Sequence, residues 1–243
     1  LPPRAPVGGA DGDTATTYDG LEALAGTAGD AAFDLAGFPY AGALNGLGHG
    51  AGGDTIEGSP NYVVTGAGSG TASAGAQTSF SNIENLSGTA GADTFTLTSG
   101  SIEDLSGLGD DDTFDVGTGT FASIDGGSGT GDAVSFANAV ALNIAATPIS
   151  AVESVSAKGV AGGPLRGASA YLCKGSTAVE ANGVSSTLYS GFETLQGTSG
   201  DDVFDLAGFT FAGILNGLAE GIGGDTVAGS TTYVLTGAGS GTA

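Results

Sequence analysis

A long internal repeat constrains the fold of this chain more than any other feature of its sequence. Residues 18–72, which begin YDGLEALAGTAGD, align without a gap on residues 189–243, which begin YSGFETLQGTSGD. Roughly two thirds of the aligned positions are identical, so one structural arrangement is expected to occur twice. The final residues, TGAGSGTA, match 65–72, after which the first copy continues. We therefore expect the chain to be a section of a longer array.

A shorter period lies inside the long repeat. The spacing from Ile83 to Ile102 equals the spacing from Leu105 to Ile124, since 102 − 83 = 124 − 105 = 19. Each period contains, in this order, an apolar residue, a Leu that is usually preceded by a Glu two positions earlier, a Gly-containing turn, an Asp, and an apolar-x-apolar pair. The final alternation is typical of a short strand with one buried face. The segments that share the pattern are Phe80–Leu97, Ile102–Val116 and Phe121–Phe136.

This period predicts an all-β fold, a parallel β-solenoid with coils of about 19 residues. Each coil would contribute two short strands and two turns, and would bury its apolar face only by stacking on the next coil. Four phenylalanines at equivalent positions would stack inside: Phe33, Phe95, Phe114 and Phe204. Repeats of a β-sandwich are the alternative, because their strands also recur every 8 to 12 residues or so. A sandwich gives no reason for a fixed period.

The repeats divide the chain into four parts. Residues 1–17 are expected to form an extended N-terminal segment, and residues 18–155 to form solenoid coils. Residues 189–243 are the second copy of 18–72. Residues 156–188 contain three of the four basic residues together with Pro164 and Cys173, and we expect them to form an irregular excursion from the coils.

Composition excludes several classes of partner. The chain has 48 Gly, a formal net charge of −22 and only 4 Lys and Arg residues. Phosphate binding needs clustered basic residues, so a nucleic-acid partner is excluded, and an anionic membrane surface is disfavoured for the same reason. The sequence has no apolar run of about 18 residues that could span a bilayer. Disorder is not expected, because hydrophobic residues make up 40% of the chain and recur at fixed spacings.

Catalysis is not expected either. The acids at 110–112 could resemble the acid and base of a glycosidase, but the Arg, Lys, His and Trp residues that would hold a sugar are nearly absent. His49, the single histidine, aligns with Glu220 and is expected in a solvated turn. The recurring Glu residues are expected to face outward: Glu22, Glu84, Glu103, Glu153 and Glu193. Cys173 is either a small buried residue or an intermolecular cross-link.

Two turn sequences suggest a metal. LSGLGDDDTFDV (105–116) and IDGGSGTGDAVSF (124–136) resemble the hemolysin-type calcium-binding repeat, GGxGxDxUx with U apolar. The resemblance implies calcium ligands at Asp112 and Asp132, with looser matches at Asp93, Asp54, Asp202 and Asp225. Only one turn per coil has the signature, and Ala31 replaces the Asp in the first copy. The alternative is that these Asp residues cap Gly turns and face water.

More broadly, phrases of the type IENLxGTxGxDTFT resemble the tandem-repeat regions of giant bacterial adhesins and haemagglutinin-like surface proteins. The resemblance implies a secreted, non-enzymatic protein at the bacterial cell surface, which forms a fibre, filament or adhesin stalk and assembles with copies of itself. Two other functions stay open. One is a calcium-dependent surface-layer or matrix protein. The other is a module that binds a surface glycan through residues 156–188.

Overall fold

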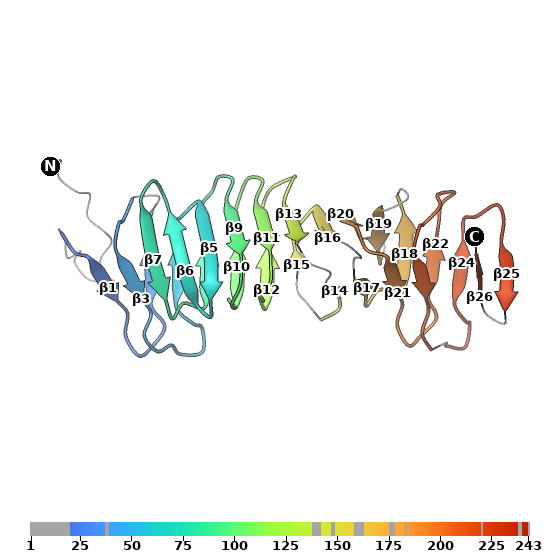
Figure 1. Ribbon diagram of the computed structural model, residues 1–243, viewed down its shortest axis with the longest axis horizontal. Helices are drawn as coiled ribbons and strands as arrows, with labels where there is room; N and C mark the ends of the chain where they lie inside the picture. The colour runs from blue at the N-terminus through green and yellow to red at the C-terminus, as the bar shows by residue number, and fades with distance from the viewer. Residues whose placement is uncertain are drawn as a thin grey trace. The chain divides into compact units, whose positions relative to one another are not determined.

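The computed structural model describes residues 20–36, 39–137, 142–146, 149–157, 163–174, 178–182, 184–219, 221–237 and 240–242. The chain divides into two compact units, residues 1–132 (unit 1) and 133–243 (unit 2) (Figure 1). The described residues form strands and no helix, which confirms the all-β prediction. None of them forms a helix that could cross a membrane. The predicted extended segment, 1–17, lies outside the described residues.

Unit 1 contains two sheets of short strands. One has the order β1-β3-β7-β6-β5-β9-β11, and the other has the order β2-β4-β8-β10-β12. The strands are β1 (Ala23–Ala25), β2 (Ala32–Asp34), β3 (Ala43–Asn45), β4 (Thr55–Glu57), β5 (Asn61–Gly66), β6 (Ser69–Ser73), β7 (Gln77–Ser81), β8 (Asn85–Ser87), β9 (Thr94–Leu97), β10 (Asp104–Ser106), β11 (Thr113–Val116) and β12 (Ser123–Asp125).

The short period of the sequence corresponds to parallel pairing between strands of successive repeats. Leu86 of β8 pairs with Leu105 of β10, and Leu105 pairs with Ile124 of β12. All three side chains are buried. Because side chains alternate across a strand, the single apolar residue of each short strand faces the core. Each repeat therefore adds one apolar residue to the same row.

The described core includes a stack of aromatic rings. The ring centroids of Tyr62 and Phe95 lie 5.2 Å apart, those of Phe95 and Phe114 lie 4.8 Å apart, and both pairs are nearly parallel. Such stacked pairs stabilise a fold by about 0.5–1.5 kcal/mol beyond the burial of their surface. Phe33 does not belong to this stack, contrary to our expectation, because it pairs with Ile56 in the other sheet.

An antiparallel meander explains the position of Phe33. Strands β5, β6 and β7 pair in antiparallel order, β7 joins β3 in parallel and β5 joins β9 in parallel. Strands β2 and β4 precede the meander, and in each of them the central apolar residue is followed by an acid. Both strands lie in the same sheet as β8. After it, the corresponding strands β9 and β11 lie in the other sheet. The meander therefore exchanges the two sheets between successive repeats.

Unit 2 is built in the same way. One of its sheets has the order β13-β16-β20-β19-β18-β22-β24 and another the order β14-β17-β21-β23, while β25 and β26 form a hairpin. The strands are β13 (Ala133–Phe136), β14 (Leu142–Asn143), β15 (Ile149–Ser150), β16 (Ser154–Ala157), β17 (Pro164–Arg166), β18 (Ala170–Cys173), β19 (Ala178–Ala181), β20 (Val184–Ser190), β21 (Thr194–Gln196), β22 (Val203–Asp205), β23 (Ile214–Asn216), β24 (Thr226–Ala228), β25 (Val234–Gly237) and β26 (Ser240–Thr242).

The described part of segment 156–188 consists largely of strands, where the sequence suggested an irregular excursion. Strands β18, β19 and β20 form a second antiparallel meander. Tyr171 opens this meander as Tyr62 opens the first. Tyr62 donates its hydroxyl hydrogen to the carbonyl of Ser87 at 2.7 Å, and Tyr171 donates to the carbonyl of Gln196 at 2.8 Å. The two acceptors have the same separation in sequence as the two tyrosines, since 196 − 87 = 171 − 62.

Candidate functional site

The predicted metal ligands all lie in one kind of loop. In each repeat a strand ends, a Gly opens a loop, and an Asp closes it immediately before the next strand. We call these the aspartate loops. They are Gly46–Asp54, Gly88–Asp93, Gly107–Asp112 and Gly126–Asp132 in unit 1, and Gly197–Asp202 and Gly217–Asp225 in unit 2.

The closing Asp of most loops bonds to the backbone of the neighbouring repeat. Its Oδ1 accepts the N–H group of the residue that closes the preceding loop, at 2.6–3.0 Å. The donor and acceptor pairs are Ala31 to Asp54, Asp93 to Asp112, Asp112 to Asp132, and Asp202 to Asp225. These carboxylates therefore connect one repeat to the next.

Two of the closing aspartates also stabilise their own loop. Oδ2 of Asp93 accepts the Thr89 N–H at 2.6 Å, and Oδ1 of Asp93 accepts the Thr89 hydroxyl hydrogen at 3.0 Å. Thr198 makes the equivalent bonds to Asp202. Short polar side chains often satisfy the backbone of a tight turn in this way.

The carboxylates are packed against glycine. Asp54, Asp93, Asp112, Asp132 and Asp202 are buried, whereas Asp225 is exposed. A Cβ atom placed on the Gly that opens a loop would collide with Oδ2 of the closing Asp in at least five loops: 46–54, 88–93, 107–112, 197–202 and 217–225. The Gly and Asp of one loop thus form a matched pair, because the carboxylate occupies the space that a side chain would fill.

Burial changes the acidity of this row. Desolvation raises the pKa of Asp112 from 3.8 to about 7, although the hydrogen bond from the Asp93 N–H acts in the opposite direction. Oδ2 of Asp112 is buried without a hydrogen-bond partner, which also favours the neutral form. Burial likewise raises the pKa of Asp93.

The raised pKa predicts a stability that falls as pH rises. The folded chain holds a proton on Asp112 that the unfolded chain releases above pH 3.8, so the contribution of Asp112 to stability is complete below that pH and is lost as pH rises through about 7. Asn resembles the protonated acid. We therefore expect Asp112→Asn to flatten the pH dependence of the unfolding free energy between pH 4 and pH 8, measured by urea denaturation. An unchanged slope in Asp112→Asn would contradict the assignment.

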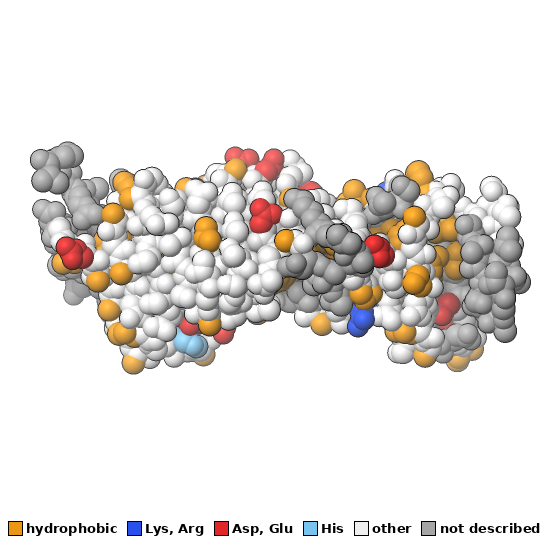
Figure 2. All heavy atoms as spheres, viewed as in Figure 1, with side chains coloured by type: hydrophobic (Ala, Val, Ile, Leu, Met, Phe, Trp, Pro, Cys, Tyr) orange, Lys and Arg blue, Asp and Glu red, His pale blue; other side chains and the backbone are white. Residues whose placement is uncertain are grey.

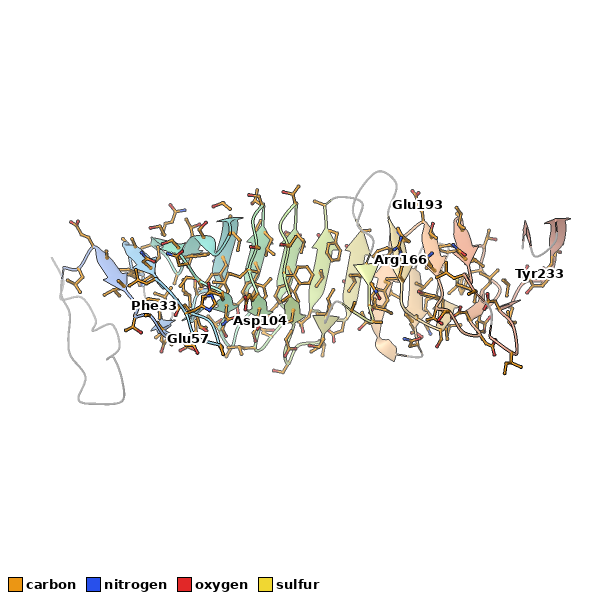
Figure 3. The ribbon with its side chains drawn as sticks, turned by 90° about the horizontal axis from the view of Figure 1, so that it is seen from below. Phe33, Glu57, Asp104, Arg166, Glu193 and Tyr233 are labelled. Carbon is orange, nitrogen blue, oxygen red and sulfur yellow. The ribbon has the colours of Figure 1, made fainter. Side chains whose placement is uncertain are left out.

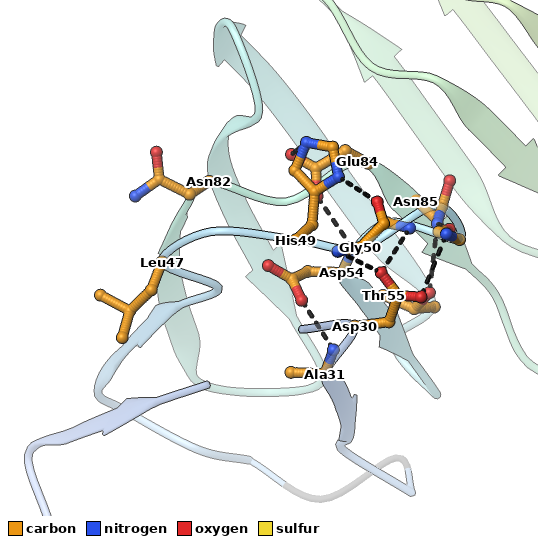
Figure 4. A network of polar contacts seen from close by, with 12 residues as sticks. Asp30, Ala31, Leu47, His49, Gly50, Asp54, Thr55, Asn82, Glu84 and Asn85 are labelled. Atoms are coloured by element: carbon orange, nitrogen blue, oxygen red, sulfur yellow. Dashed lines mark hydrogen bonds and ion pairs between the residues drawn. The ribbon is translucent and has the colours of Figure 1, made fainter. Parts of the chain in front are cut away.

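A second row of aspartates bonds toward the following repeat (Figure 4). Oδ1 of Asp30 accepts the Gly50 and Gly53 N–H groups at 2.6 and 3.0 Å. Asp201 likewise accepts the Gly223 and Gly224 N–H groups, and Asp111 accepts that of Thr130. Sequence reasoning missed this row. The sequence feature that could have revealed it is a pair of adjacent aspartates, at 111–112 and at 201–202.

Glu84 and His49 lie next to this aspartate loop of the first copy (Figure 4). Oε2 of Glu84 accepts the Asp54 N–H at 2.8 Å, and Oε1 lies 3.7 Å from Nε2 of His49. His49 is exposed, as predicted. Its pKa is raised by the hydrogen bond with the Gly50 backbone and then by the charge of Glu84. Of the other recurring acids, Glu22, Glu103 and Glu193 are exposed and Glu153 is half-buried.

The described contacts of these carboxylates are hydrogen bonds from backbone N–H and hydroxyl groups. Calcium takes about six to eight oxygen ligands, which carboxylates and backbone carbonyls can supply. Among the described residues, no three His, Cys, Asp or Glu side chains are grouped so that they could hold a metal. The six predicted ligands are therefore spread along rows, one carboxylate from each repeat.

The remaining candidates are two groups in unit 2. Cys173 is buried, and burial raises the pKa of its thiol, with a smaller effect from the charge of Asp205, so the reactive thiolate is disfavoured. Lys174 pairs with Glu180 at 3.0 Å, and Arg166 is exposed. On the face shown in Figure 2, acidic side chains occur in small groups among uncharged polar and backbone atoms.

Comparison with family models, with curated proteins and with solved structures gave no match to this chain.

Proposed function

We propose that this chain is a non-enzymatic structural protein of the bacterial cell surface, a section of a fibre or adhesin stalk built from parallel β-solenoid units. The observation that carries the proposal is the repeated parallel register. In unit 1, the same position of β8, β10 and β12 pairs in turn, and the same position of β5, β9 and β11 does so in the other sheet. Each repeat thus lengthens the ladder.

The contacts within each unit serve this role. Aromatic rings stack from one repeat to the next, and the two rows of aspartates bond to the preceding and following loops. Strand ladders with such contacts depend mainly on the nearest neighbours, so an array can be long without a larger core.

The surface chemistry supports an extracellular location. A net charge of −22 keeps an exposed protein soluble and opposes unspecific association with other acidic surfaces. One Cys, which is buried, and an absence of Met and Trp leave few side chains that oxidation would damage. We therefore propose that the chain is secreted and displayed in an oxidising environment.

Surface labelling tests the function and separates it from a calcium-dependent layer. Antibodies raised against the chain should label intact source cells, and protease added outside the cells should remove the label. Since the aspartate loops bond to backbone N–H groups, we expect the label and the β-sheet circular dichroism of the purified chain to persist in excess chelator. Label found only after cell lysis would contradict the fibre proposal. Loss of the label and of the β-sheet signal in chelator would instead favour the calcium-dependent layer.

A further inference from the structure

The two sheets of unit 1 differ in the charge of their outward-facing side chains. In the sheet β2-β4-β8-β10-β12, four strands carry an exposed acid: Asp34, Glu57, Asp104 and Asp125. Two of these acids, Glu57 and Asp104, are labelled in Figure 3. In the other sheet, strands β5, β6, β7, β9 and β11 carry a single acid, Asp115. The outer face of these five strands, which we call the hydroxyl face, is therefore nearly uncharged, although the net charge of the chain is −22.

The hydroxyl face consists mainly of Ser, Thr, Asn and Gln side chains that form rows across the strands. The central row contains, in order, Ser79, Thr71, Val63, Thr96 and Asp115. A neighbouring row contains Asn61, Thr94 and Thr113. Adjacent strands lie about 4.8 Å apart, and every second residue of a strand is about 7 Å further along it. The polar groups therefore form a two-dimensional lattice. In Figure 2, neutral polar and backbone atoms cover most of unit 1 over these strands.

This lattice is flat and stiff. Neighbouring strands of an ordinary sheet are rotated by about 20–25°, whereas the stacked rings carried by β5, β9 and β11 are only 14° and 9° from parallel. The small angles indicate little rotation between these strands. Thr is branched at Cβ, which restricts its side chain to few rotamers. Among the described residues, the hydroxyl groups of Thr71 and Thr96 have no hydrogen-bond partner, so they are available to a ligand at fixed positions.

A flat, uncharged lattice of hydroxyl groups fits a partner that is itself flat, uncharged and periodic. A charged surface would find no complementary charges on this face, and a small molecule needs a concave site. A crystalline polysaccharide would pack its sugar rings best on the large, flat, apolar rings of aromatic residues. The aromatic residues of these five strands are buried in the core: Tyr62, Phe80, Phe95 and Phe114. Ice has the required properties, because its surface is a periodic array of water molecules that donate and accept hydrogen bonds.

We propose that the hydroxyl face of unit 1 binds the surface of ice. The hydroxyl groups of Thr71 and Thr96 exchange hydrogen bonds with water molecules of the crystal, while the methyl groups of these residues and of Val63 displace less ordered water. Side chains that are already fixed in a lattice lose little conformational entropy on binding. The inference goes beyond the proposed function, because it assigns a ligand to unit 1 and requires neither display at the cell surface nor assembly.

The residues of the face recur in the second copy of the long repeat. Val63, Thr65, Ser69 and Thr71 correspond to Val234, Thr236, Ser240 and Thr242, and Asn61 corresponds to Thr232. None of these positions gains a charge or an aromatic ring. The residue types that the proposed ligand requires are therefore kept between the copies.

Thermal hysteresis, the difference between the melting and freezing temperatures of a single ice crystal, tests the proposal. Thr71→Tyr and Thr96→Tyr each place a large ring on the hydroxyl face, which would hold the ice surface away, and Tyr is well suited to an exposed strand. The matched control is Thr55→Tyr, at an outward position of β4 in the acidic sheet. We expect the unchanged chain and the control to show hysteresis and to become enriched in slowly growing ice. Both face variants should lose the two effects.

Circular dichroism of each variant should match that of the unchanged chain, so that a loss of hysteresis reports the face and not unfolding. An unchanged chain without hysteresis, or a face variant with as much hysteresis as the control, would overturn the inference. Retention on insoluble cellulose or chitin in a chain without hysteresis would also overturn it, and loss of that retention in both face variants would identify a polysaccharide as the partner. Labelling of intact cells by a chain that does not bind ice would overturn only this inference and leave the proposed function standing.

Discussion

Gly107→Ala is expected to destabilise unit 1 by about 2–5 kcal/mol, from overpacking and from displacement of a buried hydrogen-bonded carboxyl group. The new Cβ would collide with Oδ2 of Asp112. Asp112 cannot move away without losing the hydrogen bond from the Asp93 N–H. Urea denaturation followed by circular dichroism measures the loss.

A control in the same loop isolates this effect. A Cβ on Gly109 would have its nearest neighbour, Oγ of Ser128, at 3.3 Å, so Gly109→Ala should cost less than about 1 kcal/mol. Adding Asp112→Ala to Gly107→Ala should remove the collision with Asp112 and leave only the close approach of the new Cβ to the Gly126 carbonyl oxygen, at 2.5 Å. The two changes should therefore cost less together than the sum of their separate costs. Equal stability of the two Gly variants would show that the Gly and Asp are not a matched pair.

Phe95→Ala is expected to have an equally large effect, about 3–5 kcal/mol. Phe95 is buried and lies between the rings of Tyr62 and Phe114, so its truncation leaves a cavity and removes two stacked contacts. Hydrogen exchange should show the loss of protection in β9 and in its partners β5 and β11. The control Phe209→Ala removes an exposed ring of the same kind and should change stability by less than about 1 kcal/mol. Similar losses in both variants would contradict the role of the stack.

Much of the ladder was predictable because it follows from periodicity. The spacing from Ile83 to Ile102 and from Leu105 to Ile124 predicted the parallel register, and the structure pairs Leu105 with Ile124 as expected. In a strand with a single apolar residue, that residue must face the core, and this fixes the register of the strand. The existence of the strands and their repeat were therefore visible in the sequence.

The exchange of sheets was not predictable. It depends on the meander 61–81, whose antiparallel pairing is a long-range property that strand propensity does not encode. The related meander in 170–190 was hidden because few of its residues match those of the first; Tyr62 and Tyr171 are the clearest pair. A single shared Tyr whose hydroxyl bonds to a backbone carbonyl is too weak a signal to identify without coordinates.

The contacts of the aspartate loops could not be predicted from the sequence either. A Gly-rich turn that ends in Asp has one sequence signature whether the carboxylate binds calcium or accepts a backbone N–H, since both uses need a compact loop and an oxygen acceptor. The sequence did identify the six closing aspartates as a set. The direction of their bonds, and the second row at Asp30, Asp111 and Asp201, required the position of the neighbouring repeat.

The most direct test of the central claim is the length of chains with inserted repeats. Additional copies of residues 102–120, one period, are placed after Thr120, and particle length is measured by small-angle scattering and electron microscopy. If each unit is a parallel solenoid, every copy should add about 4.8 Å, the spacing of adjacent strands, and leave the protein folded. A duplicate of residues 102–110 alone is the control and should unfold unit 1, because it shifts the following strands out of register. No increase in length with complete periods, in a chain that still folds, would contradict the solenoid.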